Sequence, residues 1–170
     1  MPTRVEPLAP AGVETVASWL ADEENHKWLD FGGGVQALGA VTLRTMLQRG
    51  THAFRLFFAD AGPAPAGVVG LVALDRRFKT AALWYVLGDK RHAGRGLTTR
   101  AVAEVLAEAF GALGLGAVNA WAVDRNVASQ RVLERCGFKR IGRQRRCHVV
   151  DGEVCDRLHY DLLPEELVTP

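Results

Sequence analysis

Residues 90–98 read KRHAGRGLT and lie between an apolar run and the longest helical pattern of the chain. The residues that form this helical pattern are apolar at every third or fourth position, namely Leu97, Ala101, Val102, Val105, Leu106, Ala109, Phe110 and Leu113. A glycine loop that opens a helix gathers main-chain N–H groups and the positive end of the helix dipole, so it can bind an anion. From the spacing alone, a plain turn with solvent-facing arginines is an equally good interpretation.

Two common phosphate-binding motifs do not fit this loop. A P-loop requires GxxxxGK[ST], which does not occur, and the dinucleotide fingerprint requires a third glycine where Thr99 stands. Gly94 and Gly96 would still let a ligand approach the main chain closely, and Arg91 and Arg95 could add charge-assisted hydrogen bonds. The loop therefore predicts a local anion site of another kind.

The rest of the chain predicts a mixed α/β domain in which strands and helices alternate in the second half. The predicted strands are residues 3–8, 52–58, 67–74, Thr80–Leu87, Ala117–Val123, 138–150 and Glu153–Leu162. The predicted helices are residues 12–20, 37–49 and 97–113, and a shorter one that Asn126 caps and Gly137 ends. Residues 22–34 are expected to be a flexible connection, 60–67 a loose hairpin loop and Asp151-Gly152 a tight turn. Without a linker or repeat, residues 1–170 are expected to form one domain.

The composition limits the class of protein. A net charge of +2 is too small to predict nucleic-acid binding, and the charge-free stretch of residues 61–74 is too short to span a bilayer. The first ten residues have no apolar core of a signal peptide, so a cytoplasmic protein that binds no membrane is expected. Cys136, Cys147 and Cys155 fit neither a disulfide framework nor zinc knuckles. Reduced thiols and no metal site are expected.

Two motifs in this order are similar to those of one family. Arg91–Gly96 matches R/Q-x-x-G-x-G/A, and this segment resembles motif A of the GNAT superfamily of N-acetyltransferases at every defined position. Residues 126–138, NVASQRVLERCGF, resemble the N-x-x-S-x-x-V-L-E-x-x-G-F motif of the branch that contains ribosomal-protein N-terminal acetyltransferases. The resemblance covers roughly residues 5–163 and is best over residues 82–142.

The resemblance implies an α/β (α+β) fold with a central mixed, mostly antiparallel sheet of about six to seven strands, flanked by helices. The sheet would be splayed between strands four and five, here Thr80–Leu87 and Ala117–Val123. It also implies acetyl-CoA as co-substrate, with its pyrophosphate on the loop amides and its pantetheine arm in the splayed opening. The residues implied to bind it are Val86, Leu87, Arg91, His92, Ala93, Gly94, Arg95, Gly96, Leu97, Thr98, Asn126 and Ser129.

The activity implied is acetyl transfer to a primary amine, of a small molecule or a peptide N-terminus, by direct attack through a tetrahedral intermediate. Strand-four backbone, namely the Val86 N–H, would stabilise the oxyanion. Many family members place a tyrosine seven residues after the motif asparagine, but Leu133 stands there, and residues 82–85 lack the glutamate of many relatives. Ser129 and Tyr85 are the remaining candidate catalytic residues, each with a structural alternative as a helix-side hydrogen bond or a core aromatic.

Several assignments stay open at this stage. The missing groups allow a second hypothesis, a catalytically weak regulatory module that binds acyl-CoA. The candidate bases Glu23, Glu24, His26 and Asp75 are more simply solvated side chains, as is the basic run at 140, 143, 145 and 146. Aromatic side chains at 19, 28 and 31 line an acceptor pocket or belong to the core. The acceptor, the acyl-chain preference and the oligomeric state, including a homodimer, are undetermined.

Overall fold

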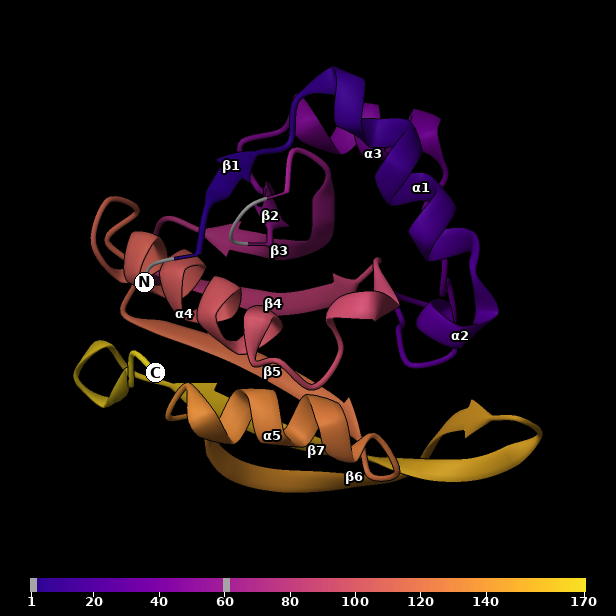
Figure 1. The fold of residues 1–170 in the computed structure, drawn as a ribbon. Helices are drawn as coiled ribbons and strands as arrows, with labels where there is room; N and C mark the ends of the chain where they lie inside the picture. Colours follow the sequence, from indigo (N-terminus) through magenta and orange to yellow (C-terminus); the bar gives the residue numbers. More distant parts are fainter. Residues whose placement is uncertain (1–2, 60–61) are drawn as a thin grey trace.

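Seven strands form one sheet in the order β1-β2-β3-β4-β5-β7-β6, counted over residues 3–59 and 62–170, which the computed structural model describes (Figure 1). They are β1 (Val5–Pro7), β2 (Ala53–Phe58), β3 (Pro65–Asp75), β4 (Thr80–Leu87), β5 (Ala117–Val123), β6 (Lys139–Val150) and β7 (Glu153–Leu162). Neighbouring strands are antiparallel except β4 and β5. The predicted mixed, mostly antiparallel sheet is therefore confirmed.

The sheet opens between β4 and β5. These two parallel strands pair only at Thr80, Ala81 and Ala82, opposite residues 117–119, and diverge over the rest of their length (Figure 1). Neighbours in a regular sheet are hydrogen-bonded throughout, so the second half of each strand has main-chain groups without a strand partner on this side. The predicted splay between strands four and five is confirmed.

Helices cover both faces of the sheet. α1 (Val13–Ala21), α2 (Glu23–His26) and α3 (Ala40–Leu47) lie on one side, and α4 (Leu97–Phe110) and α5 (Val127–Arg135) on the other (Figure 1). Because successive side chains of a strand point to opposite faces, Trp84 packs in the cluster of α1 and α3, whereas Leu83 packs in the cluster of α4. Val13, Val16 and Leu20 form the buried stripe of α1, as their spacing predicts.

The segment between α1 and α3 differs from the prediction. Residues 22–34 do connect α1 and α3, but the connection contains the short α2, which Asp22 caps by accepting from the Glu24 N–H at 3.0 Å. Further on, Asp30 Oδ1 accepts from the N–H groups of Gly32 and Gly34 at 2.8 and 3.1 Å. α3 begins later than predicted, since Gly39 is extended and forms its N-cap.

The last hairpin has the predicted turn. Val150 pairs with Glu153, and Asp151 and Gly152 both have positive φ, 50° and 79°, as a two-residue turn of this kind requires. His148 pairs with Cys155 on a buried face, and a bulge separates Gln144 from His148.

The first hairpin of the sheet and the helix lengths also bear on the predictions. The β2–β3 hairpin is confirmed, but residues 60 and 61 of its loop lie outside the described residues. Over the described ranges, no helix has both the length and the apolar composition needed to cross a bilayer.

Candidate active site

The glycine loop has the backbone geometry of an anion site. Gly94 and Gly96 have φ of 74° and 70°, a left-handed conformation that residues with a side chain rarely adopt. Gly96 is the N-cap of the 14-residue α4, which begins at Leu97. The first N–H groups of a helix have no partner within it, so those of α4 face the space beside the loop. Glycines in a plain turn would adopt the same conformation, so the interpretation as an anion site rests on the cavity beside the loop.

A cavity of about 790 Å³ connects this loop to the β4–β5 opening. It reaches both faces of the sheet, because its walls include Tyr85 on the α4 side and Trp84 on the α1 side. Of the residues predicted to bind the co-substrate, those that line it are Val86, Leu87, His92, Ala93, Gly94, Gly96, Leu97, Thr98, Asn126 and Ser129. One cavity therefore brings together the two sequence motifs, which lie some thirty residues apart.

Arg91 and Arg95 are the two predicted loop residues that do not line this cavity. The Arg91 guanidinium donates to both carboxylate oxygens of Asp89, with Nη2 to Oδ2 at 2.7 Å, and its side chain is 87% exposed. This contact lowers the pKa of Asp89 to about 2. Arg91 thus stabilises the start of the loop through Asp89, which already neutralises its charge.

The two candidate proton donors lie in direct contact. The Tyr85 hydroxyl is 2.7 Å from Ser129 Oγ and donates to the Ser129 carbonyl oxygen at 3.1 Å. Ser129 is placed by Asn126, whose side chain accepts from the Ser129 N–H at 3.1 Å as the cap of α5. Burial raises the pKa of Tyr85, so its phenol keeps its proton. Both residues line the cavity.

The main-chain groups of β4 face two directions. The Gly88 N–H donates to the Ala66 carbonyl of β3 at 2.9 Å. In an antiparallel strand, every second residue directs its N–H and C=O groups to the same neighbouring strand. The N–H and C=O groups of Val86, two residues before Gly88, therefore also face β3. The Leu87 carbonyl instead accepts from Lys90 Nζ at 2.7 Å. The register therefore directs the Val86 N–H, our expected oxyanion donor, toward β3, and the Leu87 main chain toward the opening.

Aromatic side chains surround the other end of the cavity. Trp28 and Phe31 line it, together with Trp84 of β4 and Trp121 of β5. Phe31 meets Trp84 edge-on, with ring centroids 5.0 Å apart. Trp19, in contrast, packs against Gly88, where any Cβ would lie 2.1 Å from the indole ring. Two of the three aromatics named from the sequence are thus pocket residues.

Charged side chains of both signs line the cavity. The cations are Arg131 and Arg135, four residues apart on α5, and Lys90 at the entry of the glycine loop. The carboxylates Glu24 and Asp30 line the side formed by the segment between α1 and α3. Glu24 pairs with Lys27 at 3.0 Å and Asp30 with Arg157 at 2.8 Å, so both carboxylates already have a cationic partner within the chain.

The other candidate bases lie elsewhere. Of the four named from the sequence, Glu24 lines the cavity; Glu23, His26 and Asp75 are not among its wall residues. Asp75 accepts from the N–H groups of Arg77 and Phe78 and so shapes a turn. No group of three or more His, Cys, Asp or Glu suited to a metal ion occurs within the described part of the chain.

Some wall residues were missed by the sequence analysis. Asn119 and Trp121 alternate on β5, so a period of two on the strand beside the opening could have identified them. His52 lines the cavity with a lowered pKa, caused by burial and by Arg49, and its Nδ1 is buried without a hydrogen-bond partner. Nothing in the local sequence distinguishes His52 from the start of an ordinary strand.

Comparisons with known proteins agree with this geometry. The model of the acetyltransferase (GNAT) domain family matches residues 3–139. A curated relative, Probable N-acetyltransferase YjcK of Bacillus subtilis (strain 168), is 39% identical over 87 residues, which are 51% of this chain and 48% of the relative. The match thus spans about half the length of that relative.

Solved structures are similar over nearly the whole chain. A crystal structure described as a probable acetyltransferase is 26% identical, with a TM-score of 0.74, and the match covers 95% of this chain and 93% of that one. A spermidine N-acetyltransferase from Vibrio cholerae, in complex with CoA and spermine, has a TM-score of 0.84 over 97% of both chains. Its 14% identity supports the shared fold alone.

Proposed function

The chain belongs to the acetyltransferase (GNAT) family, and from this premise we propose that it transfers the acetyl group of acetyl-CoA to a primary amine. The observation that carries the proposal is the single cavity that joins the glycine loop, the β4–β5 opening and the carboxylate-lined end. In our proposal, residues 1–170 act as one acyltransferase domain.

The donor would lie along the α4 side of this cavity. The amides around Gly94 and Gly96 and the start of α4 would hold the pyrophosphate, and Arg131 and Arg135 add positive charge nearby. The pantetheine arm would enter the opening, where the Leu87 main chain offers hydrogen bonds in the manner of an added strand. The walls fit an anionic ligand with an extended amide chain.

The reaction would proceed by direct attack. The amine nitrogen attacks the thioester carbon, a C–N bond forms, and the oxyanion of the tetrahedral intermediate receives a hydrogen bond from a β4 amide that faces the opening, in place of Val86. The C–S bond then breaks, and the departing thiolate takes a proton from the Tyr85–Ser129 pair. The amine loses its extra proton to water or to Glu24, which lines the acceptor end.

The acceptor is proposed as a small amine first and a peptide N-terminus second. The acceptor end is lined by the aromatic side chains Trp28, Phe31 and Trp121, a wall that suits a small amine, and the Vibrio cholerae structure of the same fold is that of a spermidine acetyltransferase. The peptide alternative rests on residues 126–138, whose motif resembles that of ribosomal-protein N-terminal acetyltransferases.

Calorimetry with CoA and a thiol-release assay with acetyl-CoA test the proposal. The acceptor panel is spermidine, tyramine, an aminoglycoside and a peptide amide with N-terminal alanine. We expect CoA binding and thiol release that at least one amine stimulates. Binding without stimulated release would favour a regulatory acyl-CoA module, and no CoA binding would refute both.

The Gly94→Glu variant tests the position of the donor site. A Cβ at position 94 meets no atom within 4 Å, so the fold should persist, but φ of 74° and a carboxylate beside the phosphates should abolish CoA binding. Gly142→Glu, on an exposed stretch of β6 with equal space, is the matched control. Retained CoA binding in Gly94→Glu, with both circular dichroism spectra unchanged, would show that the phosphate site is elsewhere.

A further inference from the structure

We propose that Arg157 of β7 is a positioning residue for the amine acceptor, because it holds residues 27–34 against the acceptor end of the cavity. The inference rests on the proposed function for what the cavity binds. Residues 27–34, which we call the acceptor segment, supply Trp28, Leu29, Asp30 and Phe31, four consecutive cavity-wall residues. Neither sequence motif includes Arg157, and the cavity wall does not include it.

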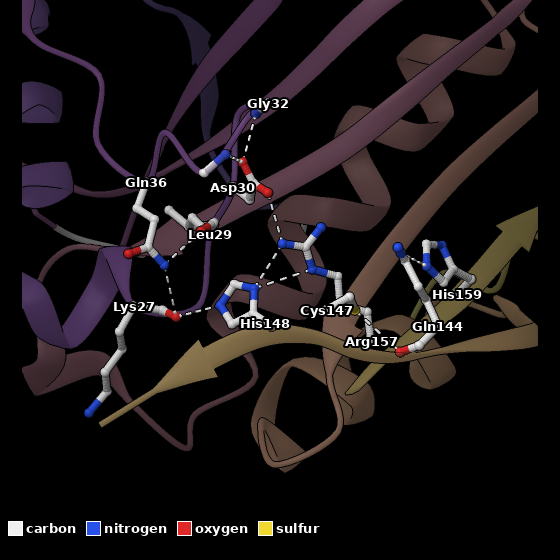
Figure 2. Close-up of polar contacts among 11 residues, drawn as sticks. Lys27, Leu29, Asp30, Gly32, Gln36, Gln144, Cys147, His148, Arg157 and His159 are labelled. Atoms are coloured by element: carbon white, nitrogen blue, oxygen red, sulfur yellow. Dashed lines mark hydrogen bonds and ion pairs between the residues drawn. The ribbon is translucent and has the colours of Figure 1, made fainter. Parts of the chain in front are cut away.

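Arg157 forms the centre of a buried polar network (Figure 2). Its Nη2 donates to Asp30 Oδ2 at 2.8 Å, and the two side chains are 14% and 15% exposed. Its Nε and Nη2 lie 3.2 and 2.9 Å from His148 Nδ1. Removing one member of such a buried ion pair leaves the other charge without a partner, which is energetically unfavourable.

The hydrogen bonds determine the tautomer of His148. Arginine has donors only, so His148 Nδ1 must accept, and the ring proton is on Nε2. That N–H donates to the carbonyl oxygen of Lys27 at 2.7 Å. His148 is 5% exposed, and its two ring nitrogens connect Arg157 to Lys27, the first residue of the acceptor segment.

The same network holds the far end of the segment. Asp30 Oδ1 accepts from the N–H groups of Gly32 and Gly34, so the carboxylate that Arg157 binds also shapes the glycine turn (Figure 2). Gln36 adds hydrogen bonds to the carbonyls of Lys27 and Leu29, at 3.4 and 3.2 Å. The acceptor segment is thus tied at residues 27, 30, 32 and 34.

Arg157 also contacts the opposite wall. Its guanidinium carbon lies 4.1 Å from the centre of the Trp121 ring, and Trp121 lines the cavity from β5. One side chain therefore links the acceptor segment to the strand across the opening. Trp28 and Trp121 also pack against the same small cluster of Val123, Val150 and Cys155, so Arg157 and this cluster together hold the two walls of the acceptor end.

Arg157→Met should raise the KM of the amine at least about tenfold, since small misplacements of a substrate-binding wall cost one to two orders of magnitude. The amine used is the panel member with the highest rate. CoA affinity by calorimetry should stay within twofold, because the glycine loop is not part of the network. The amine KM of Arg157→Lys should lie between those of the unchanged protein and Arg157→Met, because an ammonium group cannot bind Asp30 and His148 with the planar geometry of a guanidinium.

Two further variants separate positioning from folding. Asp30→Asn keeps an oxygen that accepts from the Gly32 and Gly34 N–H groups but removes the ion pair with Arg157, so it should reproduce most of the increase in amine KM. Because the two residues act as one unit, the variant with both Asp30→Asn and Arg157→Met should have a KM no higher than that of Arg157→Met alone. Arg143→Met, on the same hairpin and paired with Asp156 at 2.6 Å, is the control and should leave KM unchanged.

Hydrogen exchange gives a readout that needs no acceptor. Arg157→Met should accelerate exchange of the amides of Gly32 and Gly34 and leave residues 91–98 unchanged. Unchanged exchange over residues 27–34, or an unchanged KM with faster exchange, would overturn the proposal. If no amine of the panel reacts, the proposed function fails while the exchange result still decides whether Arg157 holds the segment.

Discussion

Tyr85 and Ser129 come from separate parts of the sequence, and their hydroxyl groups meet at 2.7 Å in the cavity wall. The residue seven positions after Asn126 is Leu133, which is fully buried in the core between the sheet and α4. That position therefore offers the cavity no hydroxyl, and β4 provides one next to α5 through Tyr85 instead. The sequence identified both residues but could not show that they touch, because 44 positions separate them.

Tyr85→Phe should lower kcat about a hundredfold, which is the lower end of the range for a lost general acid. The amine KM and the CoA affinity should change less than twofold, because the ring and its packing remain. Ser129→Ala should have a similar effect, and the double variant should add little to either one. Steady-state kinetics measure this, with Tyr160→Phe as control, since Tyr160 is buried outside the cavity wall. An unchanged kcat in Tyr85→Phe would exclude a role for the phenol.

The tyrosines also predict a pH effect. Tyr85 and Tyr160 are the only two in the chain, and burial raises the pKa of both. At pH 10 the unfolded chain loses phenol protons that the native protein keeps, so the free energy of unfolding should fall as the pH rises above 10. Absorbance at 295 nm should show clearly less phenolate in the native protein than in the urea-unfolded protein at pH 10. Equal absorbance would mean that the phenols are accessible in the folded state.

At the scale of elements, two variants of Asn126, the cap of α5, can separate its contribution to stability from its proposed contribution to CoA binding. Asn126 caps the helix through the Ser129 N–H and also lines the cavity. Asn126→Ala should lower the free energy of unfolding by about 1 kcal/mol, the usual cost of a lost cap, and weaken CoA binding. Asn126→Asp caps equally well, so it should keep the stability while its charge weakens CoA binding. Urea unfolding and calorimetry measure both, and equal losses of stability in the two variants would contradict this assignment.

The elements that the sequence predicted best are those with a strong period. β4, β5 and β7 have the predicted bounds, and α4 ends three residues before its predicted limit, since their apolar residues recur at two or at three to four positions. Within the predicted connection at 22–34 the sequence analysis missed α2 and the ordered turn after it, because these depend on the Asp22 cap, on the hydrogen bonds of Asp30 and on a distant partner. Arg157 and Asp30 are 127 positions apart, and no local pattern relates them.

For the whole molecule, ligand binding should appear as thermal stability. A ligand that binds only the folded state at 100 times its Kd adds about 2.7 kcal/mol, which corresponds to about 5–10 °C in Tm for a chain of this length. CoA should therefore raise Tm by this amount in a thermal shift assay, and Gly94→Glu should abolish the increase. A shift that persists in Gly94→Glu would mean that CoA stabilises the protein from another site.

The β4–β5 opening has a consequence for how the protein can change in evolution. An exposed stretch of main chain inside a sheet presents the same N–H and C=O groups whichever side chains the strands carry. In the proposed function, donor recognition at this place would be largely independent of side-chain identity, whereas the acceptor end would depend on particular side chains such as Trp28 and Trp121. Substitutions at the acceptor end would then alter which amine is used and leave donor binding unchanged.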